Sequence, residues 1–288
     1  MITLEALEKR IATAGSLLSV VTSMKNLAAV NMRQFERAVE ALDAYAGISD
    51  QCWRVLLRGG GLRPMPARGR AVCFVVGADQ GLCGTFNEAV ALRALEVASE
   101  LDASDGVDMW ASGERVVAAL ADAGRAVPVN VAQPAGLAGI ATAAMAAVRA
   151  LPEQPGPLVV VHNAPAQGGG FATQVLHVLP LDAAWLEEHR ATGWPRRNLP
   201  MSGLPRREFF AHLFGQYLFI SLYRAFGRSM AAENAARLAS MQRAEKNIEE
   251  MRDELSMRHR ELRQYMITAE LLEVAAGFEA LLGDATAV

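Results

Sequence analysis

The sequence predicts an α/β domain flanked by two long helices that pair as a coiled coil. All twelve prolines lie between Pro64 and Pro205, and a proline inside a helix costs about 3 kcal/mol. The two proline-free ends are therefore expected to be helical, and the segment between them alternates strand-like and helix-like runs. These observations divide the chain into an N-terminal coiled-coil helix at 1–63, an α/β globular domain at 64–205 and a C-terminal coiled-coil helix at 206–288.

The N-terminal helix carries an apolar seam with steps of three and four residues, the period of a left-handed coiled coil. Lys25 is the one charged residue in this seam. Thr3 is expected to cap the helix start, and Gly59–Gly61 followed by Pro64 are expected to end it. At 1.5 Å per residue, roughly 55 residues give a rod of about 80 Å. The seam consists of Leu4, Leu7, Ile11, Ala14, Leu18, Val21, Lys25, Ala28, Met32, Phe35, Val39, Leu42 and Ala46.

The C-terminal helix is longer, because no proline occurs between Glu208 and Leu282. Roughly 75 helical residues span about 110 Å, which is more than the N-terminal helix can accompany. We therefore expect an apolar helical tip that is exposed unless another protein surrounds it. The predicted seam consists of Leu238, Met241, Ala244, Ile248, Met251, Leu255, Arg258, Leu262, Tyr265, Ala269, Leu272 and Ala276.

The middle of the chain predicts a mostly parallel, Rossmann-like sheet, because strands alternate with helices of crossover length. Apolar runs at 70–77, 107–111 and 158–162 are expected to be buried strands. The run 127–131 is a weaker strand, because Pro128 removes a backbone donor. A further edge or hairpin strand is expected at 172–179, after the Gly168–Gly170 turn. Helices are expected at 85–103, 114–123 and 137–150.

Composition excludes several classes of protein. The chain has 28 basic and 31 acidic residues, which gives no case for nucleic acid as a main partner. Three cysteines form no disulfide framework, and the N-terminus lacks a signal-peptide pattern. The apolar stretch 209–223 is too short to cross a bilayer, so no transmembrane segment is expected.

The sequence also lacks the patterns of common active sites. There is no phosphate-loop motif and no His-Glu-x-x-His metal helix, and the five histidines are scattered without ligand spacing. No metal, cofactor or catalytic residue is therefore predicted.

One glycine-rich element, 77–84, follows the first predicted strand. It could be a phosphate cradle at a helix N-terminus, or Cys83 could be a nucleophile. Its glycine spacing fits no nucleotide-binding fingerprint, and no histidine lies nearby in sequence to activate the thiol. We favour a structural strand-to-helix turn in which glycines permit positive φ. The turn residues singled out are Asp79, Gly81, Cys83 and Gly84.

The chain resembles the gamma subunit of the F-type rotary ATP synthase over nearly its whole length. The C-terminal segment 267–277 has the family's Ile-Thr, Glu, Glu and Gly at the family's spacings, and Arg263-Gln264 precede it. The run 233–241 is similar to the family's Glu-x-Ala-Ala-Arg-Met-x-Ala-Met, and 79–84 with Asn87 matches Asp-x-Gly-Leu-Cys-Gly. Arg10-Ile11, Met24, Ala28-Ala29 and Met32-Arg33 also fall where the family has them.

Some residues depart from the family pattern. The first helix has Val20-Val21-Thr22-Ser23 where the family usually has Ile-Thr-Lys, and Asn31 where it has Lys. Phe278 stands where the family has a small residue, directly after the signature glycine. These departures indicate a divergent bacterial member, similar to the N-type ATPases proposed to pump sodium.

The resemblance implies a central rotary shaft and no catalytic residue. The two terminal helices would form an antiparallel coiled coil inside the ring of alpha and beta subunits. The α/β domain would sit with the epsilon subunit on the membrane c-ring, at the cytoplasmic face of the bacterial inner membrane. Ion-driven rotation would then be coupled to ATP synthesis or hydrolysis at the beta sites. Two alternatives remain: a soluble α/β enzyme with coiled-coil dimerisation arms, and a non-rotary coiled-coil scaffold.

The resemblance also implies which residues contact the ring. Met24 and Lys25 would face the lever region of beta, although Lys25 could equally be a seam lysine that sets the helix register. Met24 is expected near the level of Arg263–Thr268. The remaining candidates, whose alternative is a solvated helix face, are Arg33, Arg263, Gln264, Thr268, Glu270 and Glu273.

Overall fold

The structure, a computed structural model, describes residues 3–58, 69–101, 106–166, 170–192, 198 and 202–285, with side chains up to Ala276. The chain divides into two compact units, Met1–Asn26 with Met241–Val288 and, separately, Leu27–Ser240. Two long helices, α1 (Leu4–Arg58) and α6 (Arg206–Ala285), each contribute to both units.

Helix α1 begins where the sequence predicts. The Ala6 amide donates a 3.2 Å hydrogen bond to Thr3 Oγ1, so Thr3 caps the helix. The helix is continuous to Arg58. The predicted terminator at Gly59–Gly61 and Pro64 lies outside the described residues, as does the 63/64 domain boundary. Every residue of the predicted α1 seam is buried or half-buried, Lys25 included, so the predicted seam is confirmed.

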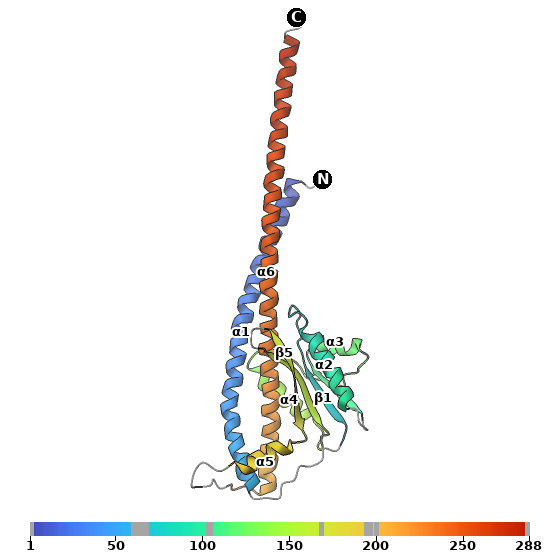
Figure 1. Cartoon of the computed structure of the whole chain (residues 1–288), viewed down its shortest axis with the longest axis vertical. Coiled ribbons are helices and arrows are strands. Elements are labelled where there is room, and N and C mark those ends of the chain that lie inside the picture. Colours follow the sequence, from blue (N-terminus) through green and yellow to red (C-terminus); the bar gives the residue numbers. More distant parts are fainter. Residues whose placement is uncertain are drawn as a thin grey trace. The chain divides into compact units, whose positions relative to one another are not determined.

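In the first unit, the start of α1 packs antiparallel against α6 (Figure 1). Lys25 contacts Glu245, and Glu8 contacts His259, so residue numbers rise along one helix as they fall along the other. Buried apolar side chains lie between the helices at Leu7, Ala14 and Met241.

Before the exposed tip, the α6 seam differs from the prediction at two positions, Met251 and Arg258. Met251 is 54% exposed and Arg258 is exposed, whereas Arg252 and His259 are half-buried. The other predicted positions up to Leu262 are buried or half-buried, and the seam uses 252 and 259 in place of 251 and 258, with Glu245 half-buried beside Ala244. The physical reason is that polar side chains reach across to α1 from this face of α6, as those of Glu245 and His259 do.

The second unit contains a five-stranded sheet in the order β3-β2-β1-β4-β5. Strands β1 (Ala71–Val76), β2 (Val107–Ser112), β3 (Val129–Asn130) and β4 (Leu158–Pro165) are parallel, and β5 (Phe171–Leu179) runs antiparallel to β4. The predicted strands are confirmed, and the edge strand is a hairpin partner of β4. One residue of the expected 168–170 turn, Gly170, is described, with φ +77°.

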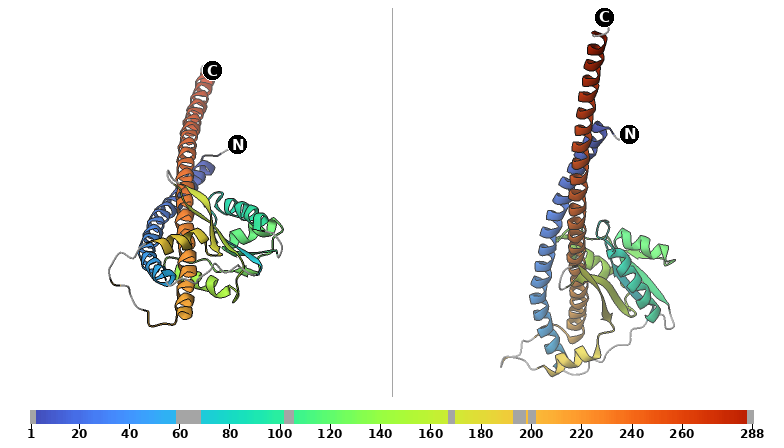
Figure 2. Two further views of the ribbon diagram at one scale, coloured as in Figure 1. Left: turned by 60° about the horizontal axis from the view of Figure 1, so that its bottom comes forward. Right: turned by 45° about the horizontal axis from the view of Figure 1, so that its top comes forward.

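Helices cover both faces of this sheet (Figure 2). Helices α2 (Phe86–Leu101) and α3 (Glu114–Asp122) pack on one face, against Cys73 and Val75. Helix α4 (Gly139–Ala150) and residues 218–231 of α6 pack on the other, against Phe74. Because both faces are covered, β1 is a continuous apolar run without polar alternation.

Helix α5 (Ala183–Ala191) was not predicted. Asp182 caps it, accepting a 2.9 Å hydrogen bond from the Ala184 amide. Its Trp185 packs edge-on against Trp53 of α1, with ring centroids 5.4 Å apart, and Phe210 of α6 also makes an edge contact with the Trp53 indole. This aromatic cluster fastens the end of α1 to the beginning of α6.

None of the helices in the described part of the chain combines the length and the apolar character that crossing a bilayer requires.

Candidate functional site

The glycine-rich element 77–84 forms a tight turn between β1 and α2. Gly84 has φ of +64°, a conformation that glycine adopts without strain, and Leu82 adopts the same φ although it is not a glycine. A side chain at Gly77 would put its Cβ 2.5 Å from Val116 Cβ. Gly84 therefore serves the turn and Gly77 its close packing, whereas Gly81 has no positive φ and its nearest neighbour, Arg115, would lie 3.7 Å from an added Cβ.

Asn87 and Cys83 hold the turn from inside. The Ala78 amide donates to Asn87 Oδ1 at 2.8 Å, while Asn87 Nδ2 donates to Cys83 Sγ at 3.8 Å. Cys83 Sγ in turn lies 3.7 Å from the Gln80 carbonyl oxygen, to which it donates. Burial, and next the charge of Glu233, raise the pKa of the Cys83 thiol. A thiol held neutral and 2% exposed is a packing group, and its environment is opposite to that of a nucleophile.

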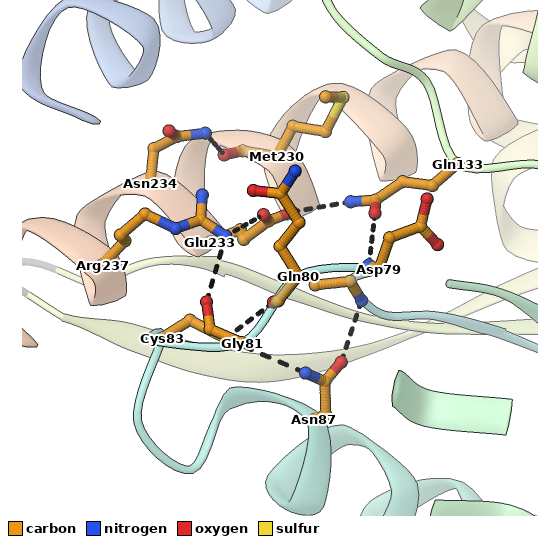
Figure 3. A network of polar contacts seen from close by, with 11 residues as sticks. Asp79, Gln80, Gly81, Cys83, Asn87, Gln133, Met230, Glu233, Asn234 and Arg237 are labelled. Carbon is orange, nitrogen blue, oxygen red and sulfur yellow. Dashed lines mark hydrogen bonds and ion pairs between the residues drawn. The ribbon is translucent and has the colours of Figure 1, made fainter. Parts of the chain in front are cut away.

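Two charged residues of α6 close over the turn (Figure 3). Glu233 and Arg237 form an ion pair of 2.6 Å, and Gln133 Nε2 donates to the other oxygen of Glu233 at 2.7 Å. Gln133 Oε1 accepts from the Asp79 amide, and Arg237 donates to the Gly81 carbonyl at 3.5 Å. Burial raises the pKa of Glu233, which Arg237 and Gln133 partly offset.

This arrangement does not suit a phosphate. Asp79 uses its carboxylate to accept from the Glu114 amide at 2.9 Å, which caps α3, and the turn faces the buried carboxyl of Glu233. An anion placed there would meet two acidic groups. Within the described residues, no group of histidine, cysteine and acidic side chains could hold a metal ion.

Of the predicted contact residues in α1, Lys25 is already paired. Its ammonium donates to both oxygens of Glu245, at 2.7 and 2.6 Å, and Thr22 Oγ1 donates to the same carboxylate at 3.1 Å. These hydrogen bonds, that of Lys25 first, lower the pKa of Glu245. The structure thus favours the register role of Lys25. Met24 is half-buried, and Arg33 is exposed.

The predicted contact residues in α6 follow one another along an exposed stretch beyond Leu262. Arg263, Gln264, Glu270 and Glu273 are all exposed, and Thr268 Oγ1 donates to the Gln264 carbonyl at 2.9 Å. They share one helix segment and lie outside the pairing with α1.

The predicted level of Met24 is wrong. Because Lys25 pairs with Glu245 and Glu8 with His259, the residues opposite Met24 are near 245. The 263–268 segment lies past the pair made by Glu8, near the beginning of α1. The prediction assumed too long an overlap between the two helices.

The same stretch of α6 exposes large apolar side chains. This part of α6 lies beyond the pairing with α1, so its apolar side chains face solvent, as the sequence predicts for the tip. The exposed fractions are 72% at Tyr265, 41% at Met266, 47% at Ile267, 65% at both Leu271 and Leu272, and 71% at Val274.

Sequence reasoning missed Gln133 and Glu245. Glu245 sits in the corrected seam opposite the one seam lysine, and an opposite charge at heptad spacing was a usable signal. Gln133 follows a two-residue strand in a loop, and no pattern marks it.

Comparisons with known proteins agree with one another. The family model described as ATP synthase matches residues 3–281. The chain is 28% identical to the ATP synthase gamma chain of Granulibacter bethesdensis over 308 residues, and 26% identical to that of Geotalea uraniireducens over 296. Each alignment covers 98% of this chain and all of the relative.

The fold is similar to solved structures at lower identity. A structure of the Tetrahymena thermophila mitochondrial ATP synthase, central stalk and c-ring, superposes with a TM-score of 0.59 at 17% identity. It covers 78% of this chain and 99% of that one. A Euglena gracilis mitochondrial ATP synthase structure, OSCP/F1/c-ring in rotational state 3, gives 0.62 at 15%, covering 96% and 94%.

Proposed function

This chain belongs to the ATP synthase family, and from that premise we propose that it is the central rotary shaft of an F-type ATP synthase. Its gamma-chain relatives align over their whole length, which supports the complete role. In this role the chain is a non-catalytic subunit. It couples ion-driven rotation of the membrane c-ring to ATP synthesis or hydrolysis at the beta subunits.

The observation that carries this proposal is the unaccompanied end of α6. Six large apolar side chains between Tyr265 and Val274 are 41–72% exposed on one helix. Apolar surface of this extent favours burial against a protein, at roughly 25 cal/mol per Å². A ring of alpha and beta subunits around the helix end would bury it from all sides.

The polar residues on the same stretch give the ring a second kind of contact. Arg263, Gln264, Thr268, Glu270 and Glu273 offer donors and acceptors between the apolar positions. As the shaft turns, each beta subunit would meet a different side of this helix. Coupling requires such differential contacts, because a surface equal on all sides would shift no equilibrium. Met24 and Arg33 are proposed as contacts of α1.

The remaining partners follow from the same role. We assign the epsilon subunit and the c-ring to the part of the chain that carries the α/β domain. The complex would lie at the cytoplasmic face of the bacterial inner membrane, with this chain as a peripheral subunit. The transported ion, proton or sodium, is decided by ligands in the membrane subunits.

A matched pair of substitutions tests the ring contact. Leu272→Asp places a charge on a side chain 65% exposed on α6, and Leu92→Asp does the same to a side chain 62% exposed on α2. Each variant is co-expressed with alpha and beta subunits. We expect Leu272→Asp to lower co-purification and ATPase activity several-fold, and Leu92→Asp to leave both unchanged.

Equal behaviour of the two variants would contradict the proposal. The alternatives make different predictions: an α/β enzyme would turn over substrate without alpha and beta, and a scaffold would bind them without affecting hydrolysis.

A further inference from the structure

We propose that the 77–84 turn and the Glu233–Arg237 pair form a rigid joint that locks the α/β domain to α6, so that the two rotate as one body. The joint residues Gln133, Glu233 and Arg237 are positioning residues for torque transfer. This inference rests on the proposed function and goes beyond it, because it places the point at which torque enters the shaft helix.

The joint draws together segments far apart in the sequence (Figure 3). Asp79 and Gly81 come from the turn after β1, Gln133 from the loop after β3, and Glu233 and Arg237 from α6. One chain of contacts runs from the Asp79 amide through Gln133 and Glu233 to Arg237, which returns to the turn at Gly81. The α/β domain is thus tied to α6 at two points of the same turn.

One face of α6 serves this turn. One helical turn before Glu233, Ser229 Oγ donates to the Val76 carbonyl at 3.2 Å. Ala232 and Ala236 pack on Cys83 and Phe86, and both alanines are at most 5% exposed. Small residues on this face let the turn approach the helix, and the flanking polar residues fix its position.

The network adds direction to an interface that is otherwise apolar. The sheet also packs on α6 through Phe74, Leu222 and Phe226, and this burial is non-directional, so small rotations change it little. The ion pair is different, because Glu233 is 6% exposed and the Arg237 side chain 13%. Separating the pair leaves a buried charge without its partner. The network therefore resists turning of the domain about α6, which is the direction of the torque.

The test measures coupling in the whole reconstituted complex. Arg237→Ala breaks the joint, and Arg224→Ala is the matched control, since Arg224 of α6 pairs with Asp43 of α1 at 2.7 Å and lies outside the network. The readout is ATP-driven ion uptake into vesicles divided by ATP hydrolysis in the same sample. We expect this ratio to fall several-fold in Arg237→Ala, with hydrolysis retained, and to stay at the wild-type value in Arg224→Ala.

A covalent lock separates loss of the joint from general damage. Ala236→Cys, or Ala232→Cys in a second variant, places a thiol in the cluster that contains Cys83, with which it is meant to pair. Both variants carry Cys52→Ser. Treatment with the thiol oxidant diamide at pH 8.5 would form the disulfide, because the diamide takes up the two electrons and two protons that the two thiols lose. We expect the disulfide to leave coupling unchanged in the otherwise native chain, and to restore it in Arg237→Ala until a reductant is added.

The outcomes distinguish the two claims. If the unsubstituted complex hydrolyses ATP but takes up no ion, the proposed function fails. If it is coupled and Arg237→Ala is equally coupled, only the joint is overturned. A disulfide that abolishes coupling in the native background also overturns the joint, because the domain must then move on α6 during turnover.

Discussion

Lys25 illustrates how a single polar residue can organise an apolar seam. Its side chain is 26% exposed and that of Glu245 20%, and the two meet at 2.6 Å. A polar residue at one seam position specifies register, because any shift along the helix leaves it facing apolar groups. The adjacent Thr22 donates to the same carboxylate. Two donors from α1 thus fix one acceptor on α6.

The Lys25–Glu245 pair predicts a pH dependence of stability. The hydrogen bonds from Lys25 lower the pKa of Glu245 in the folded chain below its ordinary 4.5. A lowered folded pKa contributes stability that is present above pH 4.5 and is lost as pH falls through the folded pKa. Glu245→Gln should therefore lower the unfolding temperature at pH 7 and narrow its difference from wild type below pH 4.5. Thermal unfolding of both proteins at pH 7 and below pH 4.5 measures this. An equal difference in unfolding temperature under the two conditions would contradict it.

Cys83 is expected to be unreactive toward soluble reagents at neutral pH. Burial raises the pKa of its thiol, so the reactive thiolate is scarce at neutral pH. Cys83→Ala should keep the ATPase activity of the assembled complex within about twofold, since the lost contacts are weak sulfur hydrogen bonds. Iodoacetamide should label Cys83 at pH 7.5 only after unfolding. Loss of ATP turnover in a fully assembled Cys83→Ala complex would instead support the hypothesis that Cys83 is a nucleophile.

At the scale of elements, the sequence was most informative where one physical rule acts alone. The distribution of prolines located both long helices, and continuous apolar runs located β1 and β4. Two positions of the α6 seam were misplaced because an apolar pattern gives no weight to polar residues that pair across helices. Helix α5 was missed because its nine residues present a weak apolar face, although Asp182 is a good cap. The motifs at 79–84 and 233–237 were both identified, but their contact became visible only in the structure.

The antiparallel register can be tested by cysteine crosslinking. Lys25→Cys with Glu245→Cys should be joined by a short bifunctional maleimide, because the native side chains bridge the two helices at that level. Met24→Cys with Arg263→Cys should not, because Arg263 lies past the pair that His259 makes with Glu8. Non-reducing electrophoresis of the native complex reports both. A strong crosslink in the second variant would contradict the register described here.

Straight continuity of α6 is predicted to matter more than any side chain along it. Met251 is 54% exposed, so Met251→Ala removes little and should be fully coupled. Met251→Pro removes a backbone hydrogen bond and clashes with the preceding turn, at about 3 kcal/mol or more. It should prevent assembly or uncouple ion transport from hydrolysis in vesicles. A coupled Met251→Pro complex would exclude a rigid-shaft mechanism.

For the whole molecule, the described residues favour a mechanical role over a catalytic one. The one site that resembled a nucleotide cradle is a closed structural turn, and burial raises the pKa of Cys73 to about 12 and raises that of Cys83 as well. The surface that the chain offers to partners is that of a helix. Between Tyr265 and Val274 it combines exposed apolar side chains with exposed polar ones. A shaft uses such a surface by turning it.

Direct observation of rotation tests this account most directly. The complex of this chain with alpha and beta subunits is fixed through beta to a surface, and a bead is attached to a cysteine introduced at Leu92, which is 62% exposed on α2. With ATP present, we predict that the bead turns in one direction, in steps, and stops when ATP is removed. A complex that hydrolyses ATP at its full rate while the bead stays still would contradict the central claim.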